Sequence, residues 1–155
     1  MLHVYVDADA CPVKAEVLRV ADRCGLEVTL VAGSWMRAPV SQRVRLEVVG
    51  GGLDAADRWI AEQVGVDDIV VTNDVPLAAR CVERGAAALR PDGRQLTAEN
   101  IGAALATRDL LHDLRGFGEG TGGPPPFTRR DRSRFLDALD RTVQAIRRRR
   151  EAVGP

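Results

Sequence analysis

The sequence predicts a single α/β domain built on a mainly parallel sheet with helices on both faces. Short apolar runs of strand length alternate with longer segments whose apolar residues recur at helical spacing, which is the pattern of a parallel sheet. The chain of 155 residues is 45% hydrophobic, enough for the core of one ordinary domain. A third observation concerns chemistry: several aspartates stand where strands should end or helices should begin.

The first half of the chain supplies three predicted strands and two predicted helices. Pro12 suits the first turn of a helix, and Gly25 suits the cap at its C-terminal end. Three consecutive glycines, residues 50–52, separate the third strand from the second helix. The predicted strands are residues 3–6, 27–32 and 44–49, and the predicted helices are residues 12–23 and 54–64.

The second half supplies two further strands, residues 69–72 and 86–89, and three helices, residues 75–83, 97–114 and 128–150. A Gly- and Pro-rich stretch predicts an irregular loop before the last helix. The domain, residues 1–155, is therefore expected to comprise an α/β body (1–115), this loop (116–127) and a C-terminal helix (128–150). The apolar stripe of that helix should dock on the body, and the arginines at 147–150 should stay free in solvent.

Charge is unevenly distributed, although the formal net charge is zero. Residues 1–123 carry 13 basic and 18 acidic side chains, whereas residues 124–155 carry 9 and 4. Such a split is typical of an acidic catalytic body with a basic arm for nucleic acid, and also of a simple solvated end. Asp7 and Asp9 interrupt the first apolar run, and no stretch approaches the roughly 20 apolar residues that span a bilayer. We therefore expect a cytoplasmic protein with no membrane partner.

Five aspartates are the candidate metal ligands: Asp7, Asp9, Asp54, Asp57 and Asp74. The first strand should lie between the second and the fourth, so the residues that follow the first and fourth strands meet in a crevice at the carboxyl edge. Asp54 and Asp57 are three apart and share one face of a helix. Clustered carboxylates repel one another unless a cation compensates them, and hard oxygen donors suit Mg²⁺ or Mn²⁺.

Helix capping is the structural alternative for three of these residues. Asp9, Asp54 and Asp74 each stand at or just before a helix start, where one side-chain hydrogen bond contributes about 1 kcal/mol. Capping explains Asp7 poorly, because this residue ends a strand. The two histidines lie in a strand and on a late helix, which leaves a Ser-His-Asp or Cys-His system little to work with.

A different enzyme class also fits part of the pattern. The sequence Asp7-Ala8-Asp9 resembles the nucleophile and acid/base pair of haloacid dehalogenase-like phosphatases, and Ser34 could serve as the second motif of those enzymes. They also use a basic residue, usually lysine, before a final acidic pair. The only lysine here is Lys14, in the first helix, so this alternative is weakened but stays open.

Four segments together resemble the YaiI/YqxD family of bacterial proteins over nearly the whole chain: VDADACPVK, GGGLDAADRWI, DIVVTNDVPLAARCVERGAAALRPDG and TGGPPPFTRRDRSRF. That family is grouped with PIN-like domains, metal-dependent nucleases with a three-layer fold and a sheet in the order 3-2-1-4-5. The resemblance implies that Asp7 matches the acidic residue after the first strand and Asp74 the one after the fourth. It also implies that Asp54 or Asp57 matches the helical acidic residue, and that Thr72 or Asn73 supports the site.

The resulting hypothesis is a divalent-metal-dependent nuclease that hydrolyses RNA, or structured DNA, with Mg²⁺ or Mn²⁺ as cofactor. Asp7, Asp9, Asp57 and Asp74 would be the catalytic residues and would act through the metal on water and phosphate. Arginines near the second, third and fifth strands are the candidate substrate contacts: Arg37, Arg43, Arg45, Arg90 and Arg94. The alternatives are a haloacid dehalogenase-like phosphatase using Asp7 and Asp9, and a non-catalytic RNA-binding or interaction domain on the same fold.

Overall fold

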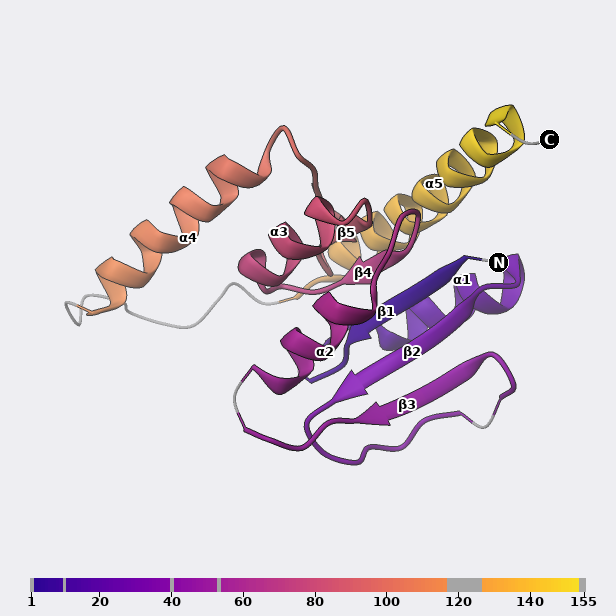
Figure 1. Cartoon of the computed structure of the whole chain (residues 1–155), viewed down its shortest axis with the longest axis horizontal. Helices are drawn as coiled ribbons and strands as arrows, with labels where there is room; N and C mark the ends of the chain where they lie inside the picture. The colour runs from indigo at the N-terminus through magenta and orange to yellow at the C-terminus, as the bar shows by residue number, and fades with distance from the viewer. Residues whose placement is uncertain (1, 10, 40, 53, 117–126, 154–155) are drawn as a thin grey trace.

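Alternating strands and helices produce a three-layer α/β/α arrangement in the computed structural model (Figure 1). The structure describes residues 2–9, 11–39, 41–52, 54–116 and 127–153. The described strands form one six-stranded sheet in the order β3-β2-β1-β4-β5-β6. The order expected for a PIN-like fold, 3-2-1-4-5, is confirmed, and a sixth strand extends it at one edge.

The strands are β1 (His3–Asp7), β2 (Glu27–Ala32), β3 (Val44–Val48), β4 (Ile69–Val71), β5 (Ala87–Leu89) and β6 (Gln95–Leu96). The helices are α1 (Lys14–Cys24), α2 (Ala55–Gln63), α3 (Val75–Glu83), α4 (Ile101–Gly116) and α5 (Arg129–Val153). All strand pairs are parallel except β5 with β6, which are antiparallel. With only two residues, β6 is too short to leave a periodic pattern in the sequence.

The central strands are buried on both faces, as expected for a parallel sheet covered by two layers of helices. In β1, Val4 and Val6 belong to the core beneath α1 and α5. Tyr5, between them in sequence, points to the other face and joins the core beneath α2 and α3. This alternation of faces follows from the two-residue period of a strand.

The C-terminal helix α5 docks on the body as predicted, with Phe135, Leu139 and Val143 fully buried. The expectation that its terminal arginines stay free is wrong for three of the four. Arg149 and Arg150 pair with Asp67 at 2.8 and 3.2 Å, and Arg147 donates to the carbonyl oxygen of Cys24 at the end of α1. The physical reason is that α5 ends beside the C-terminus of α1 and the loop before β4, where unpaired carbonyl groups and a carboxylate attract guanidinium groups.

The helix α4 leaves the body as a projecting arm (Figure 1). Its first turns pack against the core through Ile101, Ala104 and Leu105, whereas Leu110 and Leu111 are 60% and 50% exposed. The predicted loop at 116–127 lies, apart from its two end residues, outside the described part of the chain. None of the helices in the described residues has the length and apolar character to cross a membrane.

Candidate functional site

Thr72 links the carboxyl ends of β1 and β4. The two strands are paired in parallel with Val6 opposite Val71, so Asp7 and Thr72 emerge side by side at the same edge. The buried Thr72 hydroxyl donates to Asp7 Oδ2 at 2.9 Å and accepts from the backbone N–H of Asp74 at 2.9 Å. One threonine therefore fixes both the aspartate after β1 and the aspartate after β4, as the switch-point argument from the sequence requires.

Asp74 is also the N-terminal cap of α3. Its Oδ1 accepts a hydrogen bond from the backbone N–H of Leu77 at 3.0 Å. Capping and participation in an acidic site are alternatives in the sequence, but the geometry makes them compatible for this residue. A capping bond to one oxygen fixes the carboxylate and leaves the second oxygen available to neighbouring groups.

Asp54 and Asp57 reach the same edge from α2. Asp54 precedes the helix with a left-handed φ of 68°, and its side chain makes no capping hydrogen bond, so capping is not its role in this structure. Asp57, in the first turn, lies next to the Asp74 carboxylate. Burial, the proximity of that carboxylate and the charges of Asp74, Asp7 and Asp54 raise the pKa of Asp57 to about 7.

Asp9 is an exposed member of the group. Its Oδ2 accepts from the backbone N–H of Gly33, the first residue after β2, at 2.9 Å. A Cβ on residue 33 would lie 3.3 Å from that oxygen, so the glycine permits the close approach. Burial raises the pKa of Asp7 against the effect of the Thr72 hydrogen bond, and the charges of Asp74 and Asp9 add to this increase. No sequence pattern singles out Gly33; only the pairing of β2 with β1 brings it here.

The five carboxylates interact electrostatically, but they are held by different partners. Asp7 is bonded to Thr72, Asp9 to Gly33 and Asp74 to the start of α3. Within the described residues, no group of three or more acidic, histidine or cysteine side chains is arranged as a metal-binding set. In donor chemistry the group still fits a hard cation: all its donors are carboxylate oxygens, and burial followed by repulsion from the other carboxylates raises the pKa of Asp57, an increase that a cation would counteract.

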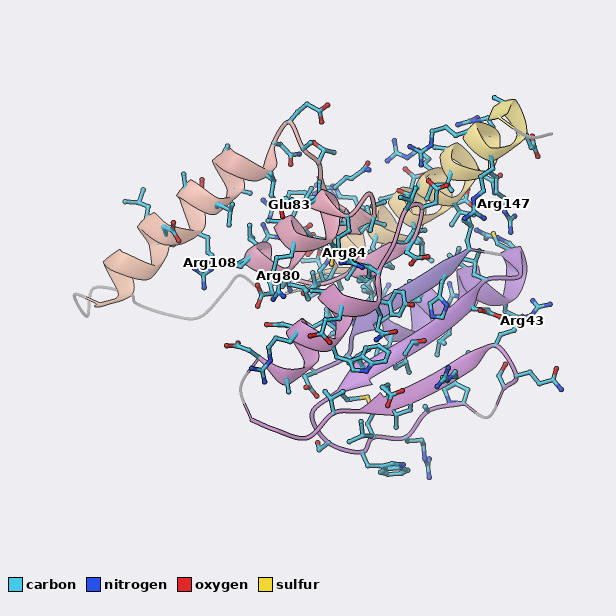
Figure 2. All side chains as sticks on the ribbon, in the orientation of Figure 1. Arg43, Arg80, Glu83, Arg84, Arg108 and Arg147 are labelled. Carbon is cyan, nitrogen blue, oxygen red and sulfur yellow. The ribbon has the colours of Figure 1, made fainter. Side chains whose placement is uncertain are left out.

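The arginines predicted to contact substrate fall into two groups. Arg90 and Arg94 line a groove that also includes Asn73, the neighbour of Asp74. Arg43 lies at the opposite, amino edge of the sheet, with a guanidinium nitrogen 3.3 Å from where a Cβ on Gly25 would stand (Figure 2). The structure therefore brings only the first of these groups next to the aspartates.

The other two predicted contacts are exposed. Arg45 lies on β3, an edge strand of the sheet, opposite Thr29 of β2, and is 3.7 Å from Glu47. Arg37 follows β2 in the connection to β3 and is exposed. Lys14 is relevant only to the phosphatase alternative. Its ammonium group lies 3.2 Å from the carbonyl oxygen of Ala8, the residue between Asp7 and Asp9 in the sequence.

The fold and this acidic edge define a PIN-like α/β protein. The chain belongs to the family described as "Uncharacterized BCR, YaiI/YqxD family", whose model matches residues 5–145. It is 58% identical over 147 residues to a UPF0178 protein of Rhodopseudomonas palustris (strain HaA2), which covers 95% of this chain and 90% of that protein. A UPF0178 protein of Parvibaculum lavamentivorans is 56% identical over 149 residues, covering 96% of this chain and 98% of the relative. No solved structure matches the chain significantly.

Proposed function

We propose that this protein is a divalent-metal-dependent nuclease that hydrolyses phosphodiesters of RNA, or of structured DNA, at the edge formed by Asp7, Asp57 and Asp74. The observation that carries the proposal is the convergence of Asp7, Asp57 and Asp74 at one edge, where burial and the neighbouring carboxylates raise the pKa of Asp57 to about 7. Carboxyl groups pressed together at a sheet edge, at a cost in stability, are a feature of functional sites rather than of structural ones. Membership of the family is consistent with this proposal but does not specify a reaction.

The contacts of individual side chains suggest a separate role for each residue of the site. Thr72 keeps Asp7 in one orientation through its hydroxyl, and the start of α3 does the same for Asp74. Asp57, with a pKa of about 7, is able to hold or release a proton at its carboxyl oxygen near neutral pH. A bound Mg²⁺ or Mn²⁺ would supply activation of water and stabilisation of phosphate charge. Asp7, Asp9, Asp54, Asp57 and Asp74 are the residues available to hold it.

A phosphomonoesterase using Asp7 and Asp9 is the second candidate, because the Lys14 ammonium group lies 3.2 Å from the Ala8 carbonyl oxygen between them. A cation at that position could attract a phosphomonoester. Against this, Asp7 Oδ2 already accepts the Thr72 hydrogen bond and Asp9 Oδ2 that of Gly33. Each carboxylate has one oxygen committed to a structural partner, which favours a binding role over that of a nucleophile.

The deciding experiment is a cleavage assay with end-labelled RNA and hairpin DNA in Mn²⁺, in Mg²⁺ and in EDTA. We expect cleavage only with metal, and a loss of at least about 100-fold in Asp57→Asn, since this residue couples to the rest of the group. Asp22→Asn is the matched control: Asp22 is exposed on α1, away from the carboxyl edge, and should behave as the parent.

Three other outcomes would contradict the proposal. Hydrolysis of the monoester p-nitrophenyl phosphate, without hydrolysis of the diester bis(p-nitrophenyl) phosphate, would favour the phosphatase. Binding of RNA with no cleavage in either metal would favour the non-catalytic domain. Equal activity of Asp57→Asn and the parent would place the chemistry elsewhere.

A further inference from the structure

A groove of about 980 Å³ opens beside the acidic edge, between α4 and the turn that joins β5 to β6. Its position follows from the sheet: Leu89 pairs with Val71, so Arg90 leaves β5 alongside Thr72. The backbone N–H of Thr72 donates to the carbonyl oxygen of Leu89 at 3.1 Å, which fixes this register up to the edge. Arg90 is therefore one strand away from the threonine that holds the aspartates.

The groove is lined by three arginines, Arg90, Arg94 and Arg108, of which Arg90 is the least compensated. Arg94 is paired with Asp92 at 2.8 Å, and Arg108 contacts the exposed Asp109 at 3.3 Å. Within the described residues, the buried Nε of Arg90 has no hydrogen-bond partner. Burial and the neighbouring Arg94 lower the pKa of Arg90, and the charge of Asp92 opposes this only in part, so the cost of burying part of the guanidinium is incompletely offset.

The turn that carries Arg90 is held rigidly. The backbone N–H of Arg90 donates to the carbonyl oxygen of Arg94, and the N–H of Gly93 donates to that of Arg90, at 2.8 and 2.9 Å. Gly93 has a φ of 92°, and a Cβ there would lie 2.7 Å from the backbone of Arg134 on α5. The turn is thus clamped against a docked helix, and this pre-organisation reduces the entropy lost when a ligand is bound.

The rest of the lining is mixed: Asp92 and Asp131 are acidic, Gln95 and Thr107 are neutral and polar, and one stretch of the wall is apolar. The apolar stretch includes Leu96 and Ala104, from β6 and α4, together with the ring of Phe127. Asn73 and Asn100 add neutral hydrogen-bonding groups. Three arginines against two aspartates, together with an apolar stretch of wall, match a ligand that combines an anion with a flat apolar group, and the volume is sufficient for a nucleotide.

We propose that this groove binds a nucleotide, with its phosphate at Arg90 and Arg108 and its base against the wall formed by Leu96 and Ala104. A phosphate would give the buried Nε of Arg90 its missing acceptor, and charge-assisted hydrogen bonds of this kind are among the strongest in proteins. This proposal is about binding only: the groove would bind the nucleotide whether or not the aspartates hydrolyse a phosphodiester.

Calorimetric titration in EDTA tests this site independently of any metal chemistry, with inorganic phosphate, 5′-AMP and a tetraribonucleotide as probes. We expect the parent to bind AMP more tightly than phosphate, because only AMP reaches the apolar wall. The tetranucleotide distinguishes a strand from a free nucleotide: tighter binding than AMP identifies a strand as the ligand, and equal binding identifies the mononucleotide. Absence of AMP binding at millimolar concentration would overturn the inference.

Two variants remove the proposed contacts, and a third controls for charge. Arg90→Met keeps the volume of the side chain and removes its buried charge, so it should weaken AMP binding about 10-fold or more without lowering the melting temperature. Arg108→Gln, on the exposed arm, should weaken binding with no risk to folding. Arg43→Gln makes the same charge change at the far end of the molecule and should bind as the parent does (Figure 2).

Equal losses in Arg43→Gln and Arg108→Gln would reveal only non-specific attraction and overturn the proposal. Unchanged AMP binding in Arg90→Met would overturn the role of Arg90. Asp57→Asn should leave AMP binding in EDTA undiminished, so a failed nuclease assay and a failed nucleotide site are distinguishable results.

Discussion

The metal-free protein should lose stability as the pH rises from 5 to 8, and Asp57 should be a main cause. The folded protein raises the pKa of Asp57 from its ordinary value of 3.8 to about 7, so the folded state binds this proton more tightly than the unfolded chain does. A group of this kind contributes stability fully below its unfolded pKa, and the contribution disappears as the pH passes its folded pKa. Asp7, whose pKa is also raised, acts in the same direction.

The magnitude follows from linkage. Between pH 5 and a folded pKa of about 7, the folded protein holds one proton more than the unfolded chain over about two pH units, which corresponds to an upper bound of about 2.7 kcal/mol. Asp57 is only partly buried, and solvent screening reduces the effect to about 1 to 1.5 kcal/mol. For a chain of this length, that loss lowers the melting temperature by about 3 to 5 °C.

The assay is thermal unfolding in EDTA at pH 5, 6, 7 and 8, for the parent, Asp57→Asn and the control Asp22→Asn. Asparagine resembles the neutral carboxyl group and still offers a donor to Asp74, so Asp57→Asn should show a flatter profile and exceed the parent at pH 8. The control should follow the parent. Parallel profiles for the parent and Asp57→Asn would refute the contact between Asp57 and Asp74 as the source of strain.

Two further substitutions test the contacts on which the site and the fold depend. Thr72→Val keeps the shape of a buried side chain but removes the hydroxyl shared by Asp7 and Asp74. Urea unfolding should show that the free energy of unfolding falls by about 1 to 3 kcal/mol. A decrease below about 0.5 kcal/mol would contradict the role of this hydroxyl. Asp67→Asn keeps a residue that tolerates the left-handed φ of 70° at this position, yet removes the partner of Arg149 and Arg150. These arginines are largely exposed, so the expected loss is below about 1 kcal/mol and should shrink in high salt; a salt-independent loss would point to packing instead.

The sheet could be predicted from the sequence because each strand and helix is marked by the spacing of apolar residues within its own segment. Runs such as Val4 to Val6 and Ile69 to Val71 alternate with helical periodicity, and the right-handed crossover rule then leaves few possible strand orders. The same rule places Asp7 beside the end of β4, which the Thr72 bond bears out. These features depend on periodicity and chirality, and neither requires knowledge of side-chain contacts.

The features that could not be predicted depend on contacts between residues far apart in the sequence. The bond from Gly33 to Asp9 and those from Arg149 and Arg150 to Asp67 join segments 24 to 83 residues apart, and no periodic pattern encodes them. The unpartnered Nε of Arg90 is likewise invisible in the sequence, because it arises from burial in the turn after β5. Charge counting alone could not separate Arg90 from an arginine such as Arg43 at the other edge.

The order of strands gives a reason for acidic and basic groups to sit next to each other. Carboxylates at the ends of β1 and β4 repel one another and would also repel the negative charge of a phosphodiester, so binding of a phosphodiester beside Asp7 and Asp74 requires compensating positive charge. Neighbouring strands are about 4.8 Å apart, so Arg90 at the end of β5 stands one such step beyond β4. A cation among the aspartates and an arginine beside them would then act on adjacent phosphates of one strand. The two proposals, metal-dependent hydrolysis and nucleotide binding, can be tested separately but describe one arrangement. The cation would offset the repulsion among the carboxylates, and Arg90 would offset their repulsion of the phosphate.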